Sequence, residues 1–466
     1  MSDSTSEKGR LVVVSNRLPL GDNPSGGLVV ALGETLEQSG GIWIGTSRDI
    51  VDTAPTELTA HPGLGFDRMS FDLTAAEHET YYLGYSNSVL WPLFHGRADL
   101  LELRAADLDG YRAVNKRMAR FVAGVIESDD LIWVQDYHLL PLAQELRALG
   151  ITNRIGFFLH IPFPNLSDIM ALPNAVEFTG WLAQFDLVGL QAERDVSRLM
   201  EAFRSRDDAE VIDDNVVRFG PNRVYAESFP IGIDADAFAD MAESGDFAPV
   251  RLAEGERLVI GVDRLDYTKG IPQRFQAFER LLEMREDLAG KVSLLQIAPP
   301  TRGGVAAYRD IRDETEQLSG RINGRFADLD WTPIRYIHRA VPRERIAHLF
   351  RQAAVGLVTP LADGMNLVAK EYVAAQDPDD PGVLVLSTFA GAAEQMEAAL
   401  IVNPYDLDQT AEAMATALSM GLDERRARHA ELMDGLRARD IGWWSRAFLS
   451  RLRSVPRWKM DTRTEG

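Results

Sequence analysis

The sequence predicts an α/β protein of two doubly wound domains, each with a mostly parallel sheet covered by helices. Three observations predict this fold class. Short, almost purely apolar runs alternate with helical patterns along most of the chain, these runs form two groups, and a polar stretch with turn signals separates the groups. The 466 residues suffice for two domains of about 200 residues each. We therefore expect domains over residues 1–235 and 236–440, followed by a helical segment over 441–466.

The predicted strands are apolar on both faces, which is typical of a parallel sheet buried between helices. They are Leu11–Ser15, Leu131–Gln135, Ile155–His160 and Leu187–Leu190 in the first group, and Leu258–Val262, Ser293–Ile297, Val355–Thr359 and Val383–Ser387 in the second. Between the strands, apolar residues return with helical spacing, as in Pro272–Asp287 and Arg343–Gln352. Trp443–Arg453 has the pattern of an amphipathic helix that must pack on another part of the chain.

The composition excludes several classes of protein and of site. Asp plus Glu number 70 against 49 Lys plus Arg, a net charge of −21, which opposes nucleic acid or an anionic membrane as the main partner. The absence of cysteine excludes disulfides, thiolate metal sites and cysteine nucleophiles. The polar N-terminal residues lack a signal-peptide pattern, and no apolar stretch approaches the roughly 18 residues of a membrane span. We therefore expect a cytoplasmic protein.

Polar side chains and a glycine pair follow the predicted strands of the first domain, where open α/β sheets bind ligands. Arg17 follows the first strand, and Gly27 opens a helical run where backbone amides can approach an anion or a sugar. Asp136 and His160 stand at the ends of the next two strands, where a carboxylate and an imidazole can bind sugar hydroxyls or stabilise developing charge. His138 is not counted, because its side chain can point to the other side. A surface arginine, a tight loop and a structural histidine are the plainer alternatives.

The segment Tyr81–Arg97 is unusually rich in aromatic residues, which include Tyr82 and Trp91, and it also carries Asn87 and His95. Aromatic walls with polar tips suit sugars, whose C–H faces are apolar and whose hydroxyls need partners. A core segment beneath a long loop explains the same composition equally well.

In the second domain, cations and an acidic residue follow the predicted strands. Arg264 and Lys269 share one short loop before a helix, an arrangement that can neutralise a diphosphate as its charge rises. Arg302 follows the next strand and offers a further cation. Asp363–Glu371 follows a third strand and starts a helix, on which Glu371 can accept hydrogen bonds from ribose hydroxyls. A solvated ion-pair loop is the alternative for Arg264 and Lys269.

Taken together, the motifs along residues 11–407 resemble those of the trehalose-6-phosphate synthase family, the retaining sugar-nucleotide glycosyltransferases of family 20. The resemblance is carried, in chain order, by LVVVSNR, SNSVLWPLFH, VQDYHLLPLA, IGFFLHIPFP, RLDYTKG, QIAPPTRG, RINGRF, VGLVTPLADGMNLVAKEYVAAQ, PGVLVLSTFAGAAEQ and ALIVNPYD. It implies two Rossmann-like domains facing across a cleft, the glycosyltransferase-B arrangement. The first domain would bind the acceptor glucose 6-phosphate and the second the nucleotide-sugar donor, with the C-terminal helix crossing back to the first.

The resemblance also implies a role for each candidate residue. On the donor side, Arg264 and Lys269 would hold the diphosphate of UDP-glucose, Glu371 its ribose, Asp363 and His160 its glucose, with contributions from Gly27 and from the amides around Asn366, Leu367 and Val368. On the acceptor side, the phosphate would be bound by Arg17, Tyr82, Trp91 and Arg302, and the sugar by Asp136. The catalytic set is then Asp136, His160, Arg264, Lys269 and Asp363.

The implied reaction transfers glucose from UDP-glucose to glucose 6-phosphate, which gives α,α-trehalose 6-phosphate and UDP with retention of configuration. It implies no metal and no cofactor beyond the co-substrate, and we expect a homo-oligomer. The family often has tryptophan where this chain has Thr46, although Trp43 is kept. Thr46 leaves open a different phosphorylated acceptor, such as a cyclitol or glycerol phosphate, and a catalytically silent sugar-phosphate sensor is a further alternative. The sequence does not distinguish UDP from GDP or ADP in the donor.

Overall fold

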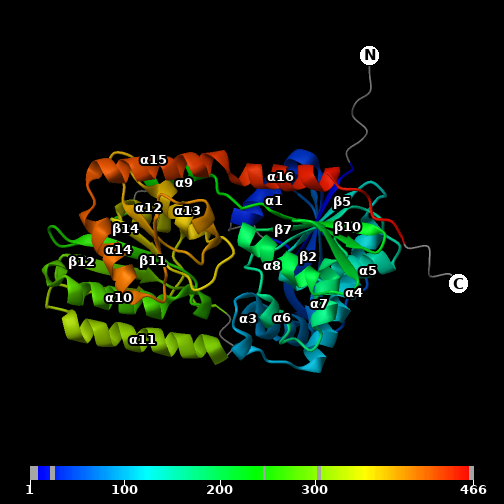
Figure 1. Cartoon of the computed structure of the whole chain (residues 1–466), viewed down its shortest axis with the longest axis horizontal. Coiled ribbons are helices and arrows are strands. Elements are labelled where there is room, and N and C mark those ends of the chain that lie inside the picture. Colours follow the sequence, from blue (N-terminus) through cyan, green and yellow to red (C-terminus); the bar gives the residue numbers. More distant parts are fainter. Residues whose placement is uncertain are drawn as a thin grey trace, which may run out of the picture. The chain divides into compact units, whose positions relative to one another are not determined.

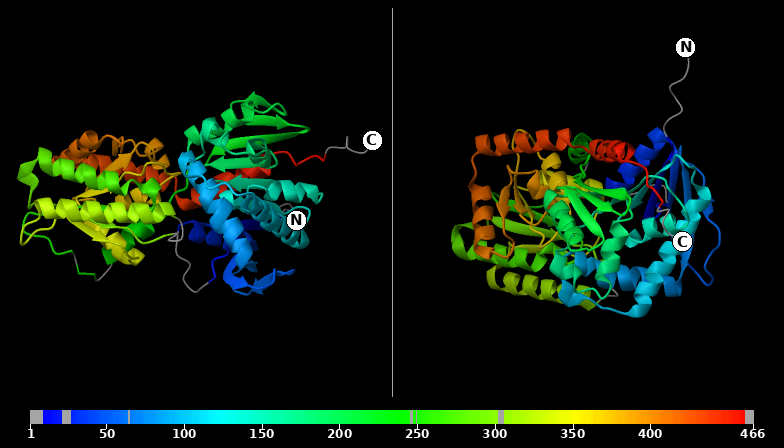
Figure 2. Two further views of the ribbon diagram at one scale, coloured as in Figure 1. Left: turned by 90° about the horizontal axis from the view of Figure 1, so that it is seen from below. Right: turned by 45° about the vertical axis from the view of Figure 1, so that its right-hand side comes forward.

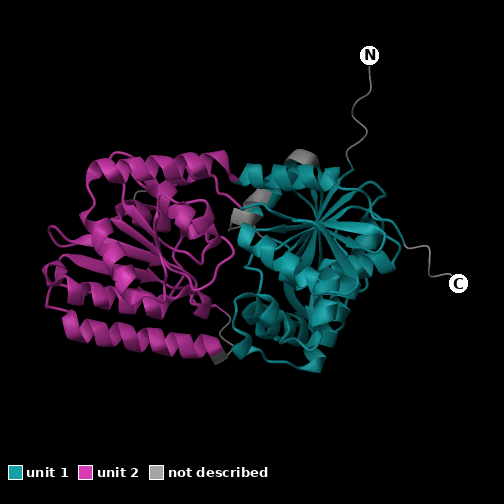
Figure 3. Cartoon of the chain, in the orientation of Figure 1, with its two compact units in different colours: residues 1–230, 441–466 teal, residues 231–440 magenta. Residues whose placement is uncertain are grey.

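The structure is a computed structural model that describes residues 9–20, 27–63, 65–244, 247–248, 250–301 and 306–460. It confirms the predicted α/β fold class, with two mostly parallel sheets. The chain divides into two compact units (Figure 3): unit 1 comprises residues 1–230 and 441–466, and unit 2 comprises residues 231–440. The division falls a few residues before the expected boundary at 235, where helix α9 (Ala235–Ser244) begins.

Unit 1 is built on a 10-stranded sheet with the order β3-β4-β2-β1-β5-β6-β7-β10-β9-β8. Pairing is parallel from β4 to β10 and antiparallel where β3, β8 and β9 join the edges. The strands are β1 (Leu11–Arg17), β2 (Gly41–Val51), β3 (Thr59–His61), β4 (Asp67–Thr74), β5 (Leu131–Gln135), β6 (Ile155–Phe158), β7 (Leu187–Leu190), β8 (Ala209–Asp213), β9 (Val216–Phe219) and β10 (Asn222–Ser228).

Helices cover the sheet of unit 1, as Figures 1 and 2 show. The longer ones are α1 (Gly27–Ser39), α4 (Ala105–Val125), α5 (Leu142–Ala148), α7 (Ala175–Leu182), α8 (Glu193–Arg204) and α16 (Ile441–Ser454). The shorter helical segments are α2 (Ala75–Glu77), the π-helical η1 (His78–Leu90), α3 (Trp91–Phe94), η2 (Ala98–Leu100), η3 (Tyr137–Leu139) and α6 (Leu166–Ile169). The predicted C-terminal helix is α16, slightly longer than its pattern suggested.

Helix α16 packs on the sheet of unit 1 through two aromatic side chains. The rings of Trp444 and Phe448 lie 4.9 and 4.7 Å from the ring of Trp133, centroid to centroid. Glycines make room for Phe448, because a Cβ at Gly156 or Gly189 would stand 2.7 Å from its ring atoms. The aromatic stripe of the last helix therefore completes the core of unit 1, although unit 2 lies between them in sequence.

Unit 2 has a six-stranded, wholly parallel sheet with the order β13-β12-β11-β14-β15-β16. Its strands are β11 (Arg257–Val262), β12 (Val292–Ile297), β13 (Ile334–Ile337), β14 (Val355–Val358), β15 (Val383–Ser387) and β16 (Leu400–Val402). This is the strand order 3-2-1-4-5-6 of dinucleotide-binding folds. The order reverses between β11 and β14, so the loops after these two strands flank the position where such sheets bind nucleotides.

The helices of unit 2 form two layers, one on each face of its sheet (Figure 1). One layer holds α10 (Ile271–Met284), α11 (Ala306–Phe326) and α14 (Leu407–Ser419), and the other holds α9, α12 (Arg343–Gln352), α13 (Leu367–Ala375) and α15 (Leu422–Ala438). Short 3₁₀ turns are η4 (Tyr267–Lys269), η5 (Glu286–Leu288) and η6 (Gly391–Glu394).

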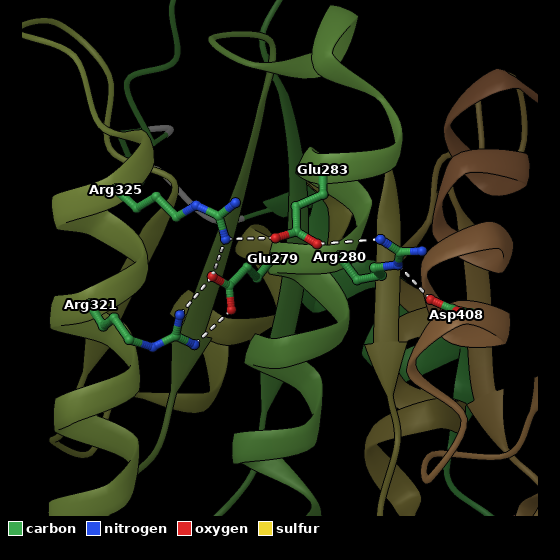
Figure 4. Close-up of polar contacts among 6 residues, drawn as sticks. All are labelled: Glu279, Arg280, Glu283, Arg321, Arg325 and Asp408. Carbon is green, nitrogen blue, oxygen red and sulfur yellow. Dashed lines mark hydrogen bonds and ion pairs between the residues drawn. The ribbon is translucent and has the colours of Figure 1, made fainter.

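Ion pairs join the outer surfaces of α10, α11 and α14 (Figure 4). Glu279 of α10 lies 2.7 Å from Arg321 and 3.0 Å from Arg325 of α11, and these arginines lower the pKa of Glu279. The network comprises Glu279, Arg280, Glu283, Arg321, Arg325 and Asp408. The guanidinium groups are largely exposed, so each pair contributes about 1 kcal/mol or less to stability. None of the helices in the described part of the chain is long and apolar enough to span a bilayer.

Candidate functional site

The loops after β11 and β14 bring Lys269, Asp363 and Asn366 together in unit 2. The Lys269 Nζ lies 2.5 Å from Asp363 Oδ2, and the Asn366 amide donates to the same oxygen at 3.0 Å. Asn366 also caps α13, because its Oδ1 accepts a hydrogen bond from the Ala369 amide at 3.2 Å. These contacts place an ammonium, a carboxylate and a helix N-terminus at the point where the strand order reverses. Such a position favours an anionic ligand.

Backbone contacts hold the two loops against each other. The carbonyl of Thr268 accepts from the Leu361 amide at 2.8 Å, and Asp266 accepts from the Thr268 amide at 3.0 Å. Gly270, with a φ of 65°, starts α10, and a Cβ there would stand 2.5 Å from the Thr359 carbonyl oxygen. Only glycine therefore lets the Lys269 loop approach the β14 loop this closely.

A buried ion pair lies beneath the same loops. Arg274, which is fully buried, contacts Asp263 at 2.7 Å, Gln296 at 2.7 Å and the Thr359 hydroxyl at 3.1 Å. Burial raises the pKa of Asp263, and the Arg274 charge opposes that shift. Arg264, which follows Asp263 in the chain, is exposed. The buried pair therefore fixes the end of β11, directly before the exposed Arg264.

Helix α13 carries the acidic residue predicted to bind ribose. Glu371 contacts Arg343 of α12 at 2.9 Å, and burial raises the pKa of Glu371 while Arg343 opposes the shift. Leu367 and Val368 form the first turn of α13, whose amides have no partner within the helix. The sequence analysis did not assign Arg343 to the site, because no local sequence pattern predicts a contact between two residues 28 positions apart.

Lys370 anchors the opposite side of α13. Its side chain is 1% exposed, and its Nζ donates to the Ile231 carbonyl at 2.7 Å and to Gln395 Oε1 at 2.9 Å. Burial lowers the pKa of Lys370 to about 7. A neutral amine still has two N–H donors, so both contacts survive loss of the proton. Lys370 thereby ties α13 to the start of unit 2.

In unit 1, Arg17 and Tyr82 meet at the carboxyl end of β1. The Arg17 guanidinium lies 4.7 Å from the centre of the Tyr82 ring, a cation–π contact. His138, which the sequence analysis left out, stacks on Tyr82, and the centres of the two rings lie 5.9 Å apart. The pKa of His78 is lowered by burial and by the Arg17 charge. These rings and the guanidinium form one surface that suits a sugar phosphate.

Asp136 and His160 lie together at the ends of β5 and β6. The His160 amide donates to Asp136 Oδ1 at 3.3 Å, and the His160 Nε2 lies 2.9 Å from Gln135 Oε1. Burial lowers the pKa of His160 to about 3, so its imidazole is neutral at physiological pH. The strand predicted over Ile155–His160 ends at Phe158, which leaves His160 in the following loop.

Most aromatic residues of the segment Tyr81–Arg97 lie in the core, as the alternative interpretation of this segment predicted. Tyr81 and Tyr85 are buried, and Trp91 is 4% exposed, with its ring 4.2 Å from that of His95 and 5.9 Å from that of Tyr137. Tyr82 is the partly exposed member of this set. The π-helical winding of η1, a form often found at functional sites, presents Tyr82 to Arg17.

Thr46 lies beside Arg17, since the two residues are paired across β1 and β2. The Thr46 hydroxyl donates to the Asn16 carbonyl at 2.5 Å, and Thr46 is 2% exposed. Gly27 is the first residue of α1, whereas Arg302 lies outside the described residues. The structure thus brings the remaining candidates into two sets, one in each unit.

The described residues contain no group of three or more histidine or acidic side chains placed to hold a metal ion.

The profile of glycosyltransferase family 20 matches residues 14–454. The chain belongs to this family. It is therefore a glycosyltransferase, and the predicted family resemblance is confirmed. A trehalose-6-phosphate synthase of Sodalis glossinidius (strain morsitans) is 45% identical over 456 residues, which cover 96% of each chain.

Two solved structures are similar along nearly the whole chain of this family 20 member. One is an alpha,alpha-trehalose-phosphate synthase (UDP-forming) from Burkholderia xenovorans in complex with glucose-6-phosphate, with a TM-score of 0.90, 46% identity, and coverage of 96% of this chain and 100% of that one. The other is an E. coli structure bound with UDP-2-fluoro glucose, with a TM-score of 0.91, 42% identity and the same coverage.

Proposed function

We propose that the chain transfers glucose from UDP-glucose to glucose 6-phosphate and releases α,α-trehalose 6-phosphate and UDP. The observation that carries the proposal is the Lys269–Asp363 pair, 2.5 Å apart, at the reversal point of a nucleotide-binding sheet. The similar proteins support the substrates, since one holds glucose-6-phosphate and another UDP-2-fluoro glucose. Unit 2 is the donor-binding domain in this proposal, and unit 1 is the acceptor-binding domain.

On the donor side, the diphosphate is neutralised by Arg264 and Lys269. An ammonium has three N–H donors, so Lys269 can keep its contact with Asp363 while it binds a phosphate oxygen. Asp363 accepts from a hydroxyl of the donor glucose, which Lys269 and Asn366 orient it to do. As the diphosphate leaves, its charge rises, and the two cations stabilise that charge more than they stabilise the bound donor.

The nucleoside is held by α13 in this proposal. Glu371 accepts from the ribose hydroxyls, and its contact with Arg343 favours the charged carboxylate despite burial. We propose that the first amides of α13, near Asn366, Leu367 and Val368, donate to phosphate and sugar oxygens of the donor, and that Gly27 contributes to the same binding.

On the acceptor side, Arg17 binds the phosphate of glucose 6-phosphate, together with Tyr82, Trp91 and Arg302. Asp136 accepts from an acceptor hydroxyl and orients it, while the neutral His160 binds a hydroxyl of the donor glucose. We infer retention by front-face attack, in which a leaving phosphate oxygen takes the proton of the acceptor hydroxyl. The other mechanism that retains configuration passes through a covalent glycosyl-enzyme intermediate, and it needs a carboxylate nucleophile with a second acid close by.

We also propose that catalysis requires no metal and no resident cofactor, because Arg264, Lys269 and a helix N-terminus supply the positive charge that a divalent ion would supply. We further propose that the chain forms a homo-oligomer and works in the cytoplasm.

The test is an assay of UDP release with glucose 6-phosphate, glucose and glycerol 3-phosphate as acceptors, and with UDP-, GDP- and ADP-glucose as donors. Fast release only with UDP-glucose and glucose 6-phosphate supports the proposal. Preference for another phosphorylated acceptor would assign the different acceptor that Thr46 leaves open. Binding of glucose 6-phosphate without any release would assign the silent sensor.

A further inference from the structure

A basic pocket of about 440 Å³ lies in unit 1, at the opposite edge of the sheet from the proposed substrate-binding residues of that unit. It is lined by Asp186 before β7, by Arg218 of β9, by Asn222 and Arg223 at the start of β10, and by Arg457 and Lys459 of the tail after α16. Strands β7 and β10 run parallel to β5 and β6 within the sheet. The pocket therefore lies at the amino edge of the sheet, opposite to Asp136 and His160 at its carboxyl edge.

The tail is a fixed wall of this pocket. Both polar atoms of the Asn222 amide bind the tail backbone: Nδ2 donates to the Lys459 carbonyl at 2.9 Å, and Oδ1 accepts from the Lys459 amide at 2.7 Å. Trp458 is 9% exposed, and its ring packs 4.5 Å from the guanidinium of Arg147. These contacts hold Arg457 and Lys459 beside β10, so the cations of the pocket are brought together by the fold.

The carboxylate of the pocket is already neutralised from within the protein. Asp186 contacts Arg147 at 2.8 Å and accepts from the Ile155 amide at 2.7 Å, and both side chains of the ion pair are almost fully buried. The Asp186 charge is therefore balanced before any ligand enters, and it opposes an anion in the pocket only weakly.

The cations of the pocket, in contrast, retain free capacity. Arg218 and Arg457 each contact one exposed carboxylate, those of Glu210 and Asp129. Within the described part of the chain, no carboxylate lies within ion-pair distance of Arg223 or Lys459. In a protein with a net charge of −21, four cations around one concave site create a local potential that attracts anions.

We propose that this pocket binds a small anion with two or more phosphate groups, outside the catalytic site. Guanidinium groups bind phosphate oxygens in a bidentate manner, and four cations exceed what a single phosphate can engage. The volume lies in the range of small-molecule sites. The ligand would bridge β10 and the tail that follows α16.

The test uses tripolyphosphate as the probe and isothermal calorimetry on the full chain, with UDP and glucose 6-phosphate present at saturation to occupy the proposed catalytic site. The variant R223Q/K459Q removes the two cations for which the described residues hold no carboxylate at ion-pair distance. The matched control is K116Q/R120Q, which removes one lysine and one arginine from the exposed surface of α4 in the same unit. A third variant, K269A, reports on binding at the proposed donor site.

We expect R223Q/K459Q to weaken tripolyphosphate binding by about tenfold or more, and the other two variants to bind as the unmodified chain does. Circular dichroism of all variants checks that the fold is kept, which the exposure of the four side chains replaced in R223Q/K459Q and K116Q/R120Q favours. Three outcomes would overturn the proposal. The unmodified chain does not bind tripolyphosphate, K116Q/R120Q weakens binding as much as R223Q/K459Q does, or K269A loses binding while R223Q/K459Q keeps it.

Discussion

Asp136 and Asn366 are the two residues other than glycine with a positive φ in the described part of the chain, at 71° and 73°. Each precedes a helical segment after a central strand of its sheet, η3 after β5 and α13 after β14. Backbone conformations of this kind cost about 1–3 kcal/mol and persist where the surroundings enforce them. The strain therefore falls on one proposed substrate-binding residue in each unit.

We expect Asp136→Gly to raise stability and to lower activity. At φ 71° and ψ 167° Asp136 occupies a region that only glycine adopts readily, so glycine relieves strain, while loss of the carboxylate removes the proposed acceptor contact. Urea denaturation measures the first effect, and kcat/KM measures the second. Asp136→Ala is the control, because it removes the carboxylate and keeps the strain. Equal stability of the two variants would contradict the strain argument.

Lys269→Ala and Arg264→Ala should each lower kcat/KM by at least about tenfold, because each removes a cation that stabilises the leaving diphosphate. Steady-state rates over a range of UDP-glucose concentrations give kcat/KM, and rates at saturation show whether kcat falls as well. Lys291→Ala, an exposed lysine of unit 2, is the matched control and should leave the rates unchanged. Normal turnover in both variants would remove these residues from the leaving-group role.

Arg17→Ala should raise the KM for glucose 6-phosphate far more than the KM for UDP-glucose. The Arg17 guanidinium, held 4.7 Å from the Tyr82 ring, is proposed to bind the acceptor phosphate. With free glucose as acceptor, the variant and the unmodified chain should be equally slow. Comparable rates of the unmodified chain with glucose and with glucose 6-phosphate would show that Arg17 serves another ligand. Arg120→Ala, an exposed arginine in the same unit, serves as the control.

The burial of His160 predicts a pH-dependent contribution to stability. Its pKa is about 3 in the folded chain and 6.5 when unfolded, so the unfolded chain binds more protons between these values. Stability therefore falls as the pH drops from 6.5 towards 3, by up to about 1.4 kcal/mol per pH unit from this group. His160→Asn should remove that part of the slope in urea denaturation between pH 4.5 and pH 7.5. An unchanged slope would show that the pKa of His160 is not lowered in the folded chain.

Activity should survive treatment with EDTA, with at most a modest loss, since the chain's own cations are proposed to stabilise the diphosphate. The measurement is UDP release after dialysis against EDTA, with and without added Mg²⁺. Complete loss that a stoichiometric divalent ion restores would replace the cation loop with a metal site.

The central strands could be predicted from the sequence because they are buried on both faces. Strands β1, β5, β6, β7, β11, β12, β14 and β15 are short apolar runs between helical patterns, and each lies where its run predicted. The other eight strands were missed, because exposed or partly exposed residues interrupt their apolar pattern; they are β2, β3, β4, β8, β9, β10, β13 and β16. An unbroken apolar run reports burial on both faces, so it identifies a strand only where burial is continuous.

The candidate residues of the site could likewise be chosen from the sequence, because polar groups after buried strands are brought to one edge of a parallel sheet. The sequence by itself thus determined the fold class, the family and the loops that carry Lys269, Asp363 and Asp136. The partners of these residues were decided by the tertiary structure alone: Lys269 meets Asp363 across 94 positions, Glu371 meets Arg343, and His138 stacks on Tyr82. A local pattern records which residues are buried, whereas such contacts depend on which loops the sheet order makes neighbours.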